Sequence, residues 1–175
     1  MTEGAGPGAT GDGDGRRDFD FLFGSWRVLN RRLASVLLRR DCTDWVEFES
    51  TAETRPILDD LGNIDDYRAP AFPAGRALAA VTVRLFDPTT RLWRIWSAST
   101  NRPGQMDPPV VGRFTNGRGQ FFCAQELHGE LIRVRFEWRD ITSMSARWEQ
   151  AFSYDQGGSW ETNWTMDLTR SEASG

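Results

Sequence analysis

Three segments near the end of the chain, residues 132–138, 146–152 and 160–170, alternate large apolar side chains with polar ones. In the first of them, a charged residue separates Phe136 from Trp138. Successive side chains of a β-strand point to opposite faces, so this period of two gives each strand one face for a core and one face for water. The segments therefore predict strands whose Arg and Glu side chains pair across the outer surface.

The rest of the chain carries similar short segments, separated by turn signals such as residues 87–90 and Asn116-Gly117. Further strands are expected over residues 26–33, 44–53, 78–87, 92–100, 110–115 and 119–127, and a strand edge followed by a loop over residues 55–63. No convincing amphipathic helix interrupts them. Eight Trp and an aromatic content of 12% are too much for a thin core. We therefore expect an all-β protein whose antiparallel sheet of about eight to ten strands closes into a barrel.

The length of 175 residues fits a single domain with a sizeable core. Residues 1–15 consist mostly of Gly, Thr, Asp and Pro, which bury too little surface to offset their ordering entropy, so a disordered tail is expected there. Residues 16–172 are expected to form the barrel domain. Within it, the apolar run over residues 19–23 can plug one end of the barrel, and Trp26 would be the first inward residue of the strand that follows.

The amino-acid composition argues against several classes of function. The net charge is −4 and no basic stripe is present, so nucleic acid is an unlikely partner. All basic charge is Arg; without Lys, Schiff-base chemistry and a phosphate-loop Lys are ruled out. No apolar run reaches the roughly 20 residues of a membrane span, and the N-terminus lacks a secretory pattern. We therefore expect a soluble cytoplasmic protein without a membrane partner.

Metal and cofactor sites also find little support. His128 is the one His and lies in a predicted hairpin turn, which argues against a catalytic triad or a multi-His metal site. Haem ligation by this residue alone is possible, but a solvated turn residue is favoured. Cys42 and Cys123 are interpreted as two buried thiols. We predict no metal and no cofactor.

An inward aromatic surface is expected from several strands. The aromatic candidates for the wall of a ligand cavity are Trp26, Trp96, Phe136, Trp138, Trp148 and Trp164. A filled core would use the same residues, and the sequence favours neither the cavity nor the filled core. Gln150 and Asn163 are amides on these strands, which must bond either other side chains, the favoured interpretation, or a ligand. Asn30 and Arg32 share the face of Trp26.

Distinctive motifs occur in six segments, the first beginning Phe-Asp-Phe-Leu-Phe-Gly-Ser-Trp: residues 19–28, 30–33, 84–88, 107–114, 146–153 and 160–164. Together they resemble a bacterial domain-of-unknown-function family with a lipocalin-like (calycin) barrel. The resemblance implies the fold and no settled activity. In lipocalin-like barrels an Arg stacks on the first Trp and closes the base. The resemblance therefore implies that Arg32 stacks on Trp26, with anion binding as its second possible role.

Glu47 and Glu49 stand two apart on one strand, as an acid and base pair would. Their alternation with Val46 and Phe48 favours an outward, Arg-paired position. If they instead face inward, burial would raise the pKa of one of them and make it a general acid. Glu47 and the inward amide of Gln150 are thus the candidates for a catalytic role.

Three functions remain open. The first is binding of one small apolar or aromatic molecule in the barrel. The second is a cofactor-independent cyclase or isomerase of secondary metabolism, pericyclase-like, which uses the same cavity to hold a substrate near its reactive geometry. The third is a scaffold with a filled core. A homodimer is possible through an exposed strand or the Pro-rich loop.

Overall fold

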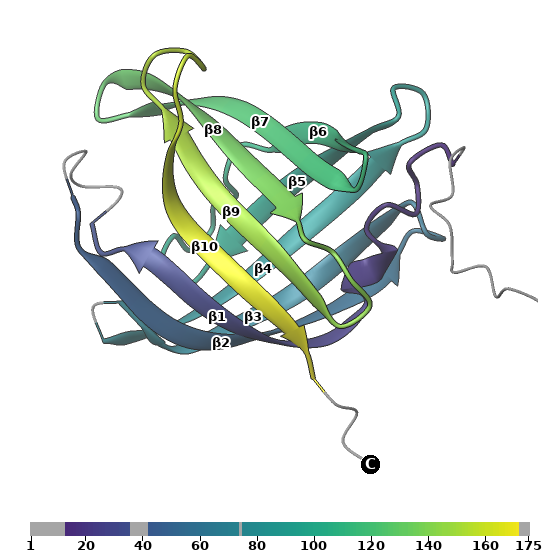
Figure 1. Cartoon of the computed structure of the whole chain (residues 1–175), viewed down its shortest axis with the longest axis horizontal. Coiled ribbons are helices and arrows are strands. Elements are labelled where there is room, and N and C mark those ends of the chain that lie inside the picture. Colours follow the sequence, from purple (N-terminus) through teal and green to yellow (C-terminus); the bar gives the residue numbers. More distant parts are fainter. Residues whose placement is uncertain (1–12, 36–41, 74, 172–175) are drawn as a thin grey trace, which may run out of the picture.

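The computed structural model describes residues 13–35, 42–73 and 75–171, and in this part the chain forms β-strands and one short 3-10 turn, η1 (Asp20–Leu22) (Figure 1). The strands are β1 (Gly24–Leu33), β2 (Trp45–Ile57), β3 (Gly62–Phe72), β4 (Arg76–Asp87), β5 (Leu92–Ser99), β6 (Val110–Thr115), β7 (Arg118–Leu127), β8 (Glu130–Arg139), β9 (Ser145–Ser153) and β10 (Glu161–Arg170). Of the expected tail over residues 1–15, residues 1–12 lie outside the described part.

The ten described strands form one closed barrel in which each strand pairs with the next, and β1 also pairs with β10. All of these pairings are antiparallel. Val28 of β1 therefore has Ser50 of β2 on one side and Leu168 of β10 on the other. The all-β antiparallel barrel predicted from the alternating segments is confirmed. Within the described segments, no helix has the length and apolar character of a membrane span.

Alternation along the strands decides which side chains enter the barrel. In β8, Ile132 and Val134 are buried among the core residues, whereas Arg133 between them is exposed. On the outer face, Arg139 donates to the carboxylate of Glu149 on β9 across 2.7 Å. This pair confirms the expectation of Arg and Glu pairs across the outer surface, because side chains two residues apart share a face.

The segment before β1 closes one end of the barrel. Phe19, only 1% exposed, packs its ring 5.0 Å from Trp93 and 5.6 Å from Phe121. The indole of Trp26 donates to the carbonyl oxygen of Leu22 across 2.7 Å, which fixes η1 beneath the first strand. The apolar run over residues 19–23 thus forms the predicted plug, and we call this end the base and the opposite end the mouth.

The Arg that stacks on Trp26 is Arg170, and the prediction of Arg32 for this position is wrong. Arg170 lies beside Trp26 in the register of β10 and β1, and its guanidinium carbon is 4.2 Å from the indole centroid. It also donates to the carbonyl oxygens of Phe21 and Phe23. Arg32 lies six residues further along β1, about 20 Å away at the rise of an extended strand, and so belongs to the mouth.

Candidate ligand-binding site inside the barrel

Above the plug, the inner face of the barrel keeps accessible surface. A close-packed core leaves the middle of each strand without accessible surface on its inner face. Here, inward side chains from most of the strands are only half-buried: Ala52, Ala80, Thr82, Ser97, Cys123, Phe136, Gln150 and Met166. Because the barrel wall is closed, the accessible surface of these inward side chains faces the interior of the barrel. The barrel therefore has a sealed base and an accessible upper chamber.

The chamber has two unlike walls. The wall from β8 to β10 is aromatic, with the ring of Trp148 lying 5.0 Å from Phe136 and 5.8 Å from Trp164. The wall from β4 and β5 carries small hydroxyl side chains, among them Thr82 and Ser97, which are half-buried. A planar molecule can therefore stack on one wall while its polar edge faces the other.

A hydrogen-bonded cluster lies between these walls, centred on Asn30, which is fully buried. Its side-chain nitrogen donates to Ser50 across 2.8 Å. Its side-chain oxygen accepts from the hydroxyl of Tyr67 at 2.9 Å and from the indole of Trp164 at 3.1 Å. Asn30 is inward as predicted, and its bonds go to other side chains. The cluster fixes the positions of the rings around it, because two of its bonds are buried and the bond of Trp164 is partly buried.

Tyr67 holds its proton tightly in this cluster. Burial raises the pKa of Tyr67 to about 12, although hydrogen bonds with Ser50 and Asn30 and the positive charge of Arg32 act in the opposite direction. The hydroxyl is therefore a donor throughout the neutral range. Since it donates to Asn30, it does not serve as a base toward a bound molecule.

Arg32 lies at the mouth, one residue before the end of β1. Its guanidinium carbon is 5.3 Å from the ring centroid of Phe72 and 5.1 Å from that of Trp164. One terminal nitrogen donates to the carbonyl of Leu33 at 3.3 Å, while Nε is enclosed without a partner among the described residues. Burial lowers the pKa of Arg32, and the neighbouring Tyr67 partly offsets this effect. Arg32 thus presents a planar cation that lies against two neighbouring rings.

A second Arg inside the barrel escaped the sequence analysis. Arg84 is 5% exposed and donates to Asp65 across 2.6 Å and to Asn63 across 2.9 Å, with its guanidinium 5.3 Å from the ring of Phe19. This ion pair lies on top of the plug and forms the floor of the chamber. Arg84 lies two residues before Phe86 on β4, and this spacing was the available signal that it points inward.

The other predicted amides also lie inside. Gln150 faces the chamber from β9 and donates its side-chain amide to the oxygen of Asn163 across 2.9 Å. Asn163 is 2% exposed and lies at a register shift in β10. The interpretation in which these amides satisfy each other is supported. Gln150 keeps accessible surface toward the chamber, and Asn163 does not.

The predicted aromatic residues fall into three groups. Phe136, Trp148 and Trp164 line the chamber. Trp26 and Trp138 belong to the base, where the ring of Trp138 lies 5.5 Å from that of Phe21. Trp96 is a correction: because Trp93 and Ile95 are buried in the core, the residue that follows Ile95 points to the outer surface. Trp96 therefore cannot line the interior.

Glu47, proposed as a general acid, also lies outside. It is exposed on β2 and approaches Arg31 of β1 at 4.0 Å. Its neighbour Phe48 takes the inward position, as the alternation favoured. Glu47 therefore cannot act on a molecule inside the barrel, and Glu47 and Gln150 do not form one catalytic site.

The thiol and imidazole candidates lie apart. His128 is exposed in the turn between β7 and β8, as predicted.

Cys123 faces the chamber, where burial raises the pKa of its thiol. Cys42 is half-buried at the mouth end before β2, so the two thiols are only partly buried, against the prediction of full burial. In the described part of the chain, no group of three or more His, Cys, Asp or Glu side chains is arranged to hold a metal ion.

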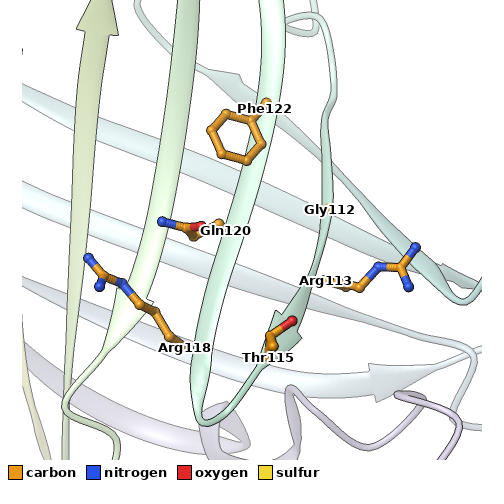
Figure 2. Close-up of a pocket in the computed structure, with 6 residues that line it drawn as sticks. All are labelled: Gly112, Arg113, Thr115, Arg118, Gln120 and Phe122. Atoms are coloured by element: carbon orange, nitrogen blue, oxygen red, sulfur yellow. The ribbon is translucent and has the colours of Figure 1, made fainter. Parts of the chain in front are cut away.

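A groove on the outer wall, between β6 and β7, is occupied by the protein's own charges. Figure 2 shows Arg118, Gln120 and Phe122 along one side of it. Arg118 and Gln120 donate to the carboxylate of Glu137 at 2.6 and 2.8 Å. Burial alone raises the pKa of Glu137, but these bonds and the charges of Arg118 and Arg135 hold it below its ordinary value. The groove is therefore part of an outer charge network.

No protein-family model matches the chain, and no curated protein matches it. Among solved structures, the S-type phycobiliprotein lyase CPES from Guillardia theta is similar, with a TM-score of 0.55 and 11% identity over 89% of this chain and 92% of that chain. A redesigned β-barrel and EF1p2_mFAP2b bound to DFHBI each give a TM-score of 0.47 and 11% identity, covering 89% and 90% of this chain and 96% and 99% of theirs. The likeness to the lyase shows the barrel fold alone.

Proposed function

We propose that this protein binds one small aromatic or apolar molecule in the chamber of its barrel, as a member of the bacterial lipocalin-like family that its motifs resemble. The observation that carries the proposal is the half-buried inner surface of Phe136 and Met166, above a base sealed by Phe19. A protein with a scaffold role would gain stability by filling this space with larger side chains.

The aromatic wall supplies the binding energy. Each 100 Å² of apolar surface that a ligand removes from water contributes about 2.5 kcal/mol before the costs of association. Trp148 and Trp164 are held edge to face at 85°, and Trp164 is fixed further by its bond to Asn30. The rings therefore lose little freedom when a ligand stacks on them.

A fluorescent probe tests the proposal. N-phenylnaphthylamine is neutral and gains fluorescence when it leaves water for an apolar site. We expect saturable binding near one equivalent. Ala80→Phe places a ring in the chamber, because Ala80 lies beside Tyr67 on the inner face, and should abolish the signal. Ala79→Phe, on the outer face of the same strand, is the matched control and should leave binding intact.

Two results would contradict the proposal. One is the absence of probe binding to the folded wild-type protein. The other is equal binding by Ala80→Phe and Ala79→Phe, which would place the probe outside the barrel. Recovery of the bound molecule after incubation, unchanged or altered, then separates binding from turnover.

A further inference from the structure

Among the described residues, the charge of Arg32 has no counterpart in the chamber. Above the plug, the charged side chains that are buried or half-buried on the inner face of the described strands are Arg32, Asp65 and Arg84. Asp65 and Arg84 neutralise each other across 2.6 Å. No carboxylate of the described residues forms an ion pair with Arg32. A charge removed from water is costly unless an opposite charge meets it, so Arg32 favours the binding of an anion.

We propose that the ligand is an aromatic or apolar molecule that carries one carboxylate, and that the guanidinium of Arg32 binds this carboxylate at the mouth. The inference rests on the proposed function, because it names the chemical class that the same chamber accepts.

The position of Arg32 sets the orientation of the bound molecule. Arg32 lies beside Val46 of β2 and Trp164 of β10 in the register of the barrel, near the mouth ends of these strands. The apolar surface of Trp148 and Phe136 lies on the adjoining wall. A molecule with its ring system on that wall therefore has its carboxylate toward the mouth, where the remaining charge also stays close to water.

The geometry of the guanidinium fits a carboxylate. The guanidinium lies against the rings of Phe72 and Trp164, and these contacts reduce the rotational freedom that is lost on binding. Because Nε is enclosed, the two terminal nitrogens are the atoms that can meet a ligand. They form a planar fork that matches the two oxygens of a carboxylate. The bond to the carbonyl of Leu33 is 3.3 Å long and uses one of their hydrogens.

A structural role at the base cannot explain this Arg. Arg170 already occupies the position over Trp26 and bonds the carbonyl groups of the plug. Arg31, the neighbour of Arg32, points outward to Trp45 and Glu47. Arg31 therefore offers a control of equal charge, one residue away, on the opposite face of the same strand.

The test is competition against bound N-phenylnaphthylamine by two molecules of the same size, naphthoic acid and naphthamide. At pH 7 the acid is ionised, because its carboxyl group has a pKa of about 4, and the amide is neutral. We expect the acid to displace the probe at a concentration at least about tenfold lower than the amide, as a charge-assisted hydrogen bond predicts. In Arg32→Met this ratio should fall to about one, while Arg31→Met should keep it.

The outcomes separate the two proposals. The carboxylate inference is overturned if the probe binds but acid and amide compete equally in the wild-type protein. It is also overturned if Arg31→Met and Arg32→Met lower the ratio alike. In both cases the barrel remains a binding site for neutral molecules. If the probe does not bind at all, the proposed function fails and the inference fails with it. A wild-type ratio near one overturns the carboxylate inference even if Arg32→Met does not fold.

Discussion

The indole of Trp164 donates to the side-chain oxygen of Asn30 across 3.1 Å, and so links the last strand of the barrel to the first from the inside. The two residues are 134 positions apart in the sequence. The same oxygen accepts from Tyr67 on β3, so this one oxygen joins β1, β3 and β10 around the chamber. Closure of the sheet and the shape of the candidate site thus depend on the same side chain.

Asn30→Leu should destabilise the barrel strongly. The substitution keeps the branching and the number of heavy atoms but removes the bonds of the Asn30 amide to Tyr67, Ser50 and Trp164. Each orphaned buried group costs about 1–3 kcal/mol, and partial rearrangement reduces the sum. We expect the free energy of unfolding, measured with urea, to fall by about 2–5 kcal/mol. Asn101→Leu, in the exposed loop after β5, should change it by less than about 0.5 kcal/mol. If the free energy of unfolding of Asn30→Leu falls no more than that of Asn101→Leu, the cluster adds no stability.

Stability should also fall in alkali because of Tyr67. Its pKa is about 12 in the folded protein against an ordinary value of 10, so the folded state holds the proton more tightly than the unfolded chain. The contribution is complete below pH 10 and is lost as the pH rises toward 12. Near-ultraviolet tyrosinate absorbance of the folded protein should therefore include a component that appears near pH 12. Tyr67→Phe should remove this component. Its persistence in the variant would show that the late titration does not come from Tyr67.

Acid should weaken the outer wall through Glu137. The folded protein holds the pKa of this carboxyl below its ordinary value, so its contribution is present at neutral pH and is lost as the pH falls through the folded pKa. Glu137→Gln should lower the free energy of unfolding at pH 7 by about 1–3 kcal/mol and flatten its decline in acid. Glu126→Gln, exposed on the outer face of β7, should leave both unchanged. Parallel stability curves for Glu137→Gln and the wild-type protein would contradict this account.

The fold could be predicted because its signal is local. The period of two in residues 132–138 fixes which face of β8 is buried, whatever the partner strands are. The plug over residues 19–23 was visible for the same reason. In β5, by contrast, Leu92 and Trp96 share one face while Trp93 and Ile95 share the other, so both faces read as apolar. The sequence pattern therefore led to the wrong prediction that Trp96 lies inside the barrel.

The candidate site depends on contacts between distant strands, which the spacing of residues does not encode. The pair of Arg84 and Asp65 follows from the register of β3 against β4. That Arg170, and not Arg32, stacks on Trp26 follows from the register of β10 against β1. Both registers are set by the closure of the whole barrel, and alternation within one strand carries no information about them.

Arg170 fastens the plug from the last position of β10, and this has a consequence for synthesis of the protein on the ribosome. Until residue 170 has left the exit tunnel, β1 and β9 each keep one unpaired edge, and the carbonyl groups of Phe21 and Phe23 lack the guanidinium that binds them. Such edges invite pairing with other chains. A nascent chain therefore carries an open sheet for most of its translation, and no molecule can be enclosed before the final strand arrives.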